Sequence, residues 1–119
     1  MQEKEAFIEE FKKRTKAFTL RSIKVFQSLP KTDEAKIIGK QLLRSASSVG
    51  ANYRAVCRAR SQAEFYSKLS ITIEEADESL FWLEILVESQ IVAENKLADL
   101  MQEAEQIIKV LSKARKNTN

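Results

Sequence analysis

Residues that make tight turns and loops are nearly missing from this chain, which has two glycines and one proline in 119 residues. Long loops and β-turns draw on those residues, so their scarcity predicts a chain that is almost entirely helical. The length is enough for one hydrophobic core, and no linker or low-complexity segment divides the sequence. We therefore expect a single all-α domain over residues 1–119.

Apolar residues recur at helical spacing in four segments, about 3–28, 33–59, 62–90 and 96–115. Pro30 closes the first segment, because the residue before a proline is pushed out of the helical region. Asp33, Ser61 and Asn95 are the expected N-caps of the other three, and Ser61 begins a capping box with Glu64. Short connections between long amphipathic helices predict an up-down-up-down antiparallel four-helix bundle.

Side chains that usually carry chemistry are sparse. The chain has no histidine, which removes the usual general acid or base at neutral pH and the commonest metal ligand. The acidic cluster of residues 74–78 lacks the inward Glu-x-x-His pairs that di-metal helix bundles need. We therefore expect no enzymatic activity, no metal site and no cofactor.

No segment has the length and apolarity of a membrane span. The longest uncharged stretch is nine residues, Ser45 to Tyr53, against about 20 for a spanning helix. The first residues are charged and lack the apolar core of a signal peptide. These features favour a cytoplasmic protein that does not contact membranes.

Charge is divided unevenly along the chain. Residues 1–60 carry 14 Lys and Arg against 6 Asp and Glu, a net charge of +8, whereas residues 61–119 carry 6 against 11, a net charge of −5. A basic half joined to an acidic half indicates complementary surfaces, either within one molecule or between copies of it.

A basic stripe runs along the helix expected at 33–59, whose second half has four arginines and no acid between residues 44 and 60. On a helical wheel, four basic side chains fall within about 80° of one another: Lys40, Arg44, Arg54 and Arg58. Small residues, Ser47 and Ala51, lie between them. Two interpretations stay open: the stripe binds phosphates, or it pairs with carboxylates of a neighbouring helix or subunit.

The helix expected at 62–90 carries a second stripe, well away from its core-facing one. Its members after the first turns are Ile71, Glu75, Glu78, Trp82 and Ile85, with Phe81 and Leu86 beside them. Exposed aromatic and aliphatic side chains together are typical of an interface. The alternative is a core that is wider than usual.

Three segments carry a family resemblance: LPK after the first helix, QLLRSASSVGANYRAVCRARS, and EFYSKLSITIEEADESLFWLEIL. Over roughly residues 24–92 the chain resembles the bacterial 23S rRNA intervening-sequence proteins, also labelled S23 ribosomal proteins. The family's pattern is met at Arg44, Ser48, Asn52, Arg54, Ala59, Ser61, Phe65, Glu75 and Glu78. The resemblance implies a closed four-helix bundle that assembles into a ring, typically a pentamer, with no established enzymatic activity.

These observations predict a non-enzymatic homo-oligomer that contacts RNA or DNA through its basic helices. The candidate nucleic-acid-binding residues are Lys12, Lys13, Lys16, Arg21, Lys24, Lys40, Arg44 and Arg58. The candidate oligomer-interface residues are Arg54, Ile71, Glu75, Glu78, Phe81, Trp82 and Ile85. Arg54 is assigned to subunit contacts because the small residues beside it favour close helix packing. The alternative is an oligomeric scaffold that binds another protein and has no nucleic-acid role.

Overall fold

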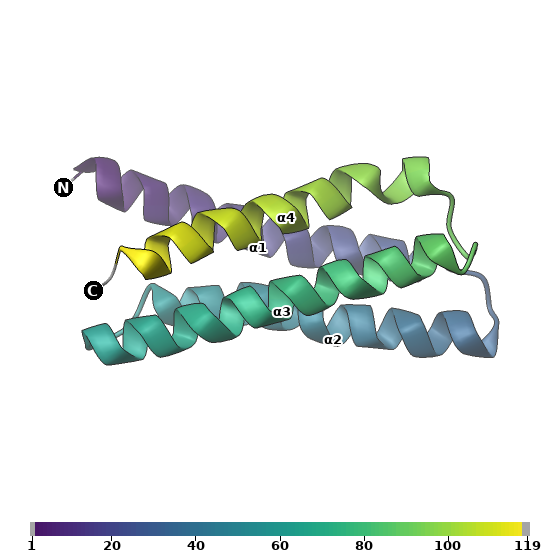
Figure 1. Cartoon of the computed structure of the whole chain (residues 1–119), viewed down its shortest axis with the longest axis horizontal. Helices are drawn as coiled ribbons and strands as arrows, with labels where there is room; N and C mark the ends of the chain where they lie inside the picture. The colour runs from purple at the N-terminus through teal and green to yellow at the C-terminus, as the bar shows by residue number, and fades with distance from the viewer. Residues whose placement is uncertain (1, 118–119) are drawn as a thin grey trace.

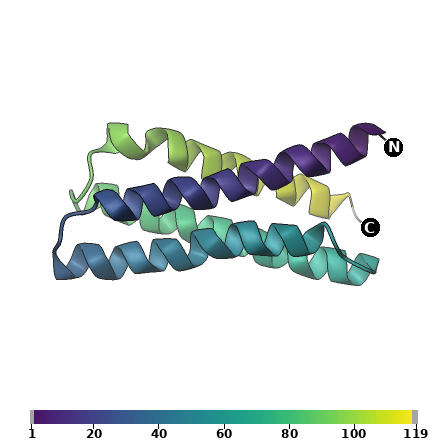
Figure 2. The ribbon, with the colours of Figure 1, turned by 180° about the vertical axis from the view of Figure 1, so that it is seen from behind.

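The computed structural model describes residues 2–117, which form four helices packed as an antiparallel bundle (Figure 1). The helices are α1 (Gln2–Ser28), α2 (Asp33–Val56), α3 (Gln62–Glu88) and α4 (Glu94–Lys116). Each helix packs against the next one along the chain, and α4 closes against α1. The start of α1, the end of α4 and the α2–α3 connection lie at the same end of the bundle (Figure 2). The predicted fold class is confirmed.

Several helix ends differ from the expected ones. Thr32 rather than Asp33 is the N-cap of α2, because its hydroxyl accepts a hydrogen bond from the Ala35 amide at 3.3 Å. Ser61 caps α3 as expected and accepts from the Glu64 amide at 3.0 Å. The N-cap position of α4 is Ala93, which makes no side-chain cap hydrogen bond, so the assignment of Asn95 was wrong.

The connection between α2 and α3 is longer than the sequence suggested, and the one between α3 and α4 begins two residues earlier. Helix α2 ends at Val56 rather than near residue 59, so residues 57–61 replace the two-residue turn expected before α3. Helix α3 ends at Glu88, where Gln90 adopts a left-handed conformation with φ 66°. The amides of Ile91 and Val92 then both donate to the Leu86 carbonyl, which ties the turn back onto the end of α3.

Both glycines lie on α2 where α1 comes close. A Cβ atom at Gly50 would lie 2.7 Å from the Thr19 hydroxyl, and one at Gly39 would lie 2.7 Å from the Phe26 ring. The Thr19 hydroxyl donates to the Ala46 carbonyl of α2 at 2.6 Å. The small residues of α2 therefore allow α1 and α2 to approach closely along their length.

The core combines large apolar side chains with a few hydroxyls. Fully buried members include Phe11, Phe18, Leu42, Leu83 and Ile107. Among the described residues, no buried side-chain nitrogen or oxygen lacks a hydrogen-bond partner. None of the helices described within residues 2–117 contains an apolar stretch of the length that a membrane span requires.

Two apolar positions were misplaced by the sequence pattern. Phe7, which fits the helical spacing of apolar residues in the segment expected at 3–28, is 50% exposed and stacks on Phe11 near the end of the bundle. Leu86, expected beside the second stripe of α3, is completely buried. Both errors come from the bundle geometry, since α1 extends beyond the packed core at its start and the α3–α4 turn covers Leu86.

Candidate functional site

A basic groove follows the contact between α1 and α2. It has a volume of about 430 Å³ and is lined by Lys12, Lys13, Lys16, Thr19, Ser47, Gly50, Ala51 and Arg54. Gly50 and Thr19 lie together in its lining, where a Cβ atom at Gly50 would lie 2.7 Å from the Thr19 hydroxyl. The lysines of α1 form one wall, and Arg54 stands on the other. We call this set of eight residues the basic groove.

The cations of the basic groove are largely unneutralised. Lys12 pairs with Glu9 at 2.9 Å, and hydrogen bonding to Lys12 lowers the pKa of the Glu9 carboxyl. Within residues 3–117, no carboxylate lies within ion-pairing distance of Lys13, Lys16 or Arg54. An anion entering the groove would therefore meet positive charge that the fold has not already paired.

The other predicted nucleic-acid residues lie at different distances from this groove. Lys40 and Arg58 are exposed on the basic stripe but outside the lining of the groove. Arg21 and Lys24 are exposed on α1 and do not line it either. The structure thus gathers the three predicted lysines at 12, 13 and 16 and adds Arg54, which the sequence had assigned to subunit contacts.

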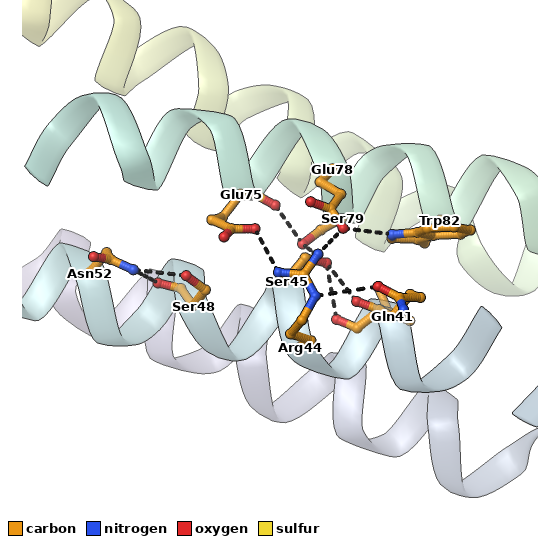
Figure 3. A network of polar contacts seen from close by, with 10 residues as sticks. Gln41, Arg44, Ser45, Ser48, Asn52, Glu75, Glu78, Ser79 and Trp82 are labelled. Atoms are coloured by element: carbon orange, nitrogen blue, oxygen red, sulfur yellow. Dashed lines mark hydrogen bonds and ion pairs between the residues drawn. The ribbon is translucent and has the colours of Figure 1, made fainter. Parts of the chain in front are cut away.

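A second polar site joins α2 to α3 and is centred on Arg44 (Figure 3). Its guanidinium donates to the carboxylates of Glu78 and, at 3.5 Å, Glu75. It also donates to the Gln41 amide oxygen at 3.3 Å, and the Trp82 indole N–H donates to Glu78 at 3.0 Å. The Trp82 hydrogen bond, followed by that of Arg44, lowers the pKa of the Glu78 carboxyl. We call these five residues the Arg44 network.

Further hydroxyl and amide side chains lie beside the Arg44 network (Figure 3). The Ser45 and Ser79 hydroxyls are hydrogen-bonded at 2.9 Å in the buried contact between α2 and α3. Within α2, the half-buried Asn52 amide donates to the hydroxyl of Ser48 at 2.8 Å and to its carbonyl at 2.9 Å. The polar side chains along the α2–α3 contact are therefore held by hydrogen bonds within the chain itself.

Glu75 and Glu78 of α3 thus pair with Arg44 and not with Arg54. The two arginines differ by about 80° around the helix, which turns Arg44 toward α3 and Arg54 toward α1. The acidic cluster of residues 74–78 is likewise divided, since Glu75 and Glu78 face Arg44 whereas Glu74 and Asp77 are exposed elsewhere. Within residues 2–117, no group of three or more His, Cys, Asp or Glu side chains gathers in a way that could hold a metal ion.

Apolar side chains flank the Arg44 network. Phe81 is 48% exposed and contacts the Trp82 ring edge-on, with ring centroids 4.9 Å apart. Ile71 and Ile85 are half-buried, and Trp82 packs partly against the core. On α2, Ile37 is 63% exposed. Trp82 therefore widens the core, as the second interpretation expects, whereas Phe81 stays on the surface and its role in an interface remains a prediction.

A family profile described as 23S rRNA-intervening sequence protein matches residues 9–113, which is most of the chain and includes both sites. The chain belongs to the 23S rRNA-intervening sequence protein family. A solved structure from Bacteroides thetaiotaomicron, described as a protein of unknown function from the S23 ribosomal protein family, has a TM-score of 0.83 and 30% sequence identity. The match covers 88% of this chain and 97% of that one. A comparison with curated proteins gives no match.

In this member of the 23S rRNA-intervening sequence protein family, sequence reasoning missed how the two sites are built. It placed Ser47 and Ala51 on the surface of α2 but did not place Gly50 against Thr19, and that contact shapes the basic groove. It also missed Gln41 in the Arg44 network. A signal for Gln41 was present, since it lies three residues before Arg44, a spacing at which helical side chains meet.

Proposed function

We propose that this protein is a non-enzymatic, ring-forming accessory protein of the cytoplasm that contacts RNA or DNA through the basic groove. The groove itself carries the proposal, because Lys13, Lys16 and Arg54 surround a floor of small residues and have no carboxylate partner within the described chain. Arginine and lysine side chains arranged this way pair with phosphate oxygens, and a shallow floor lets a sugar–phosphate backbone approach.

Binding of this kind reads the backbone and not the bases. None of the eight residues that line the groove is aromatic, so the groove offers no platform for base stacking. Affinity for different sequences should then be similar, and the salt dependence should be steep. The match to the 23S rRNA-intervening sequence protein family supports nucleic-acid binding only in that the name of the family refers to ribosomal RNA.

Ring formation is the second part of the proposal, and the surface beside the Arg44 network supports it. Phe81 and Ile37 expose large apolar areas there, and aromatic side chains often dominate the energy of protein interfaces. The family resemblance implies a pentamer. In such a ring the predicted interface residues of α3 would meet the next subunit, and the basic groove on the α1–α2 side would remain open to solvent.

The test is a titration of the protein with a fluorescent structured RNA, single-stranded DNA and duplex DNA at several salt concentrations. We expect a linear fall of log affinity with log salt, with a slope of about −0.7 per phosphate contact on single strands and about −0.9 on duplex. Sedimentation of the same sample measures the assembly. Affinity that does not respond to salt would contradict phosphate binding.

A second candidate function is an oligomeric scaffold that binds another protein and no nucleic acid. The exposed Phe81, whose ring contacts Trp82 of the Arg44 network, and the exposed Ile37 of α2 favour it. The same titration separates the two functions, because a scaffold would show no salt-dependent affinity for any of the three nucleic acids while its assembly stays intact.

A further inference from the structure

Arg54 lies where three surface hollows meet. The first is the basic groove, which Arg54 shares with Lys12 and Ala51. A second hollow continues along the start of α1 and is lined by Glu5, Ile8, Glu9, Lys12, Arg54, Cys57 and Arg58. A third follows the end of α2 and is lined by Ala51, Arg54, Ala55, Arg58, Arg60 and Glu64. An anionic chain that occupies the groove can therefore leave it by either of two routes past Arg54.

The two routes differ in charge. The α1 route contains two carboxylates, Glu5 and Glu9, and the second of these already pairs with Lys12. The α2 route contains one carboxylate, Glu64, which lies 3.5 Å from Arg60. Arg54 and Arg58 border both routes, so Arg60 is the cation that distinguishes the α2 route, and its side chain is almost fully exposed.

The two routes also differ in what covers the helix surface. Along the α2 route the residues next to the helix surface are small: Ser47, Ala51 and Ala55 recur every four residues, and Gly50 lies beside Ala51. Residues at this spacing share one face of a helix. The α1 route instead meets Ile8 and the two carboxylates. A backbone can approach α2 more closely than it can approach the first turns of α1.

We propose that a phosphodiester backbone runs along α2, from Lys16 and Ser47 past Arg54 to Arg58 and Arg60. The carboxylates of Glu5 and Glu9 repel the backbone from the route along α1. This inference rests on the proposed function, because it specifies the path of the nucleic acid across the basic groove. From Ser47 to Val56 the helix rises about 14 Å, the length of about four phosphate steps along one B-form strand. The cations that line this path are Lys12, Lys13, Lys16, Arg54, Arg58 and Arg60.

The path predicts a salt slope of about −4.2 for single strands and about −5.4 for duplex, if each of these six cations neutralises one phosphate. Single-stranded RNA, single-stranded DNA and duplex DNA of mixed sequence are the probes, because all three present the same backbone chemistry. The slopes and affinities of the three then show whether a free strand or one strand of a duplex fits the path better.

Two matched lysine and arginine variants test the route. Arg60→Ala removes a cation from the end of the α2 route, and Lys4→Ala removes an exposed cation from the first turn of α1, beyond Glu5. We expect Arg60→Ala to weaken binding several-fold at 0.1 M salt and to lower the slope by about 0.7 to 0.9. Lys4→Ala should leave both quantities unchanged, and the melting temperatures of both variants should match that of the wild type.

Each result bears on a different claim. Loss of affinity in Lys4→Ala with none in Arg60→Ala would overturn the proposed path and favour the α1 route. Salt-dependent binding that neither variant changes would also overturn the path but would leave the basic groove as the binding surface. A wild-type protein that binds none of the probes would overturn the proposed function itself.

Discussion

Arg44 and Arg54 belong to the same helix and lie in opposite electrostatic surroundings. Arg44 faces α3, where Glu75 and Glu78 accept its hydrogen bonds. Arg54 faces α1, whose lysines place further positive charge in the same groove. The residue type is the same, so the neighbouring helix decides its role. A basic stripe on one helix is thus divided by the fold into a part that joins helices and a part that stays available to an external anion.

The largest effect should come from removing three of the four cations that line the basic groove. A variant with Lys12, Lys16 and Arg54 all changed to Ala should bind nucleic acid on the order of 100-fold more weakly at 0.1 M salt, and its salt slope should fall by about 2 to 3. Its control changes three exposed lysines of α4, Lys96, Lys109 and Lys113, to Ala and so removes the same net charge. Equal loss in both variants would show that net charge matters and the groove does not.

The apolar surface beside the Arg44 network should control assembly. Phe81→Ala removes a half-exposed ring and should weaken subunit association by about 2 kcal/mol, with little change in the melting temperature of the separated subunit. Trp82→Ala should weaken association as well, but it should also lower the melting temperature, because Trp82 packs against the core and donates to Glu78. Sedimentation and thermal unfolding of both variants measure these effects.

Assembly that is unaffected by Phe81→Ala would exclude this surface as the subunit contact. A wild-type mass of 13.6 kDa in sedimentation at micromolar concentration would falsify ring formation altogether. In that case the exposed ring would remain a candidate contact for another protein, which the scaffold alternative requires.

The two arginines themselves should differ modestly in their effect on folding. Arg44→Ala leaves Glu75 and Glu78 without their cation, and we expect a loss of about 0.5–1 kcal/mol in unfolding free energy, because the side chains of Arg44 and Glu78 are 51% and 36% exposed. A buried pair would have cost several times more. Arg54→Ala should leave the melting temperature unchanged and weaken nucleic-acid binding. Equal destabilisation by both substitutions would remove the distinction between the two sites.

The fold could be predicted from the sequence because its signals are local. The spacing of apolar residues and the near absence of Gly and Pro can each be evaluated within one helix, without knowing which helix lies beside it. Where two neighbouring residues could serve the same purpose, the prediction failed, as at Thr32 and Asp33, since both side chains can cap a helix.

The sites were harder to predict because they depend on how two helices align. A helical wheel gives the direction of Arg44 and Arg54 but not which residues of α1 or α3 lie opposite them. The alignment of α2 with α3 places Glu75 and Glu78 beside Arg44, and the contact of Gly50 with Thr19 fixes α1 against α2. The lysines of the groove were found from charge alone, whereas Arg54 was assigned to the other surface.

The smallest expected effect is the acid dependence of the Arg44 network. The pKa of Glu78 is lowered from its ordinary value of 4.5 in the folded protein, first by the Trp82 hydrogen bond and then by Arg44. The folded state therefore binds fewer protons than the unfolded state near this pH, so the contribution of Glu78 to stability is complete above 4.5 and is lost as pH falls through the lowered value. Glu78→Gln should flatten the fall of the melting temperature below pH 4.5, and Asp77→Asn, an exposed neighbour, should not. An identical acid profile in all three proteins would mean that the network contributes nothing to folding through Glu78, and the contrast between Arg44 and Arg54 would then rest on geometry alone.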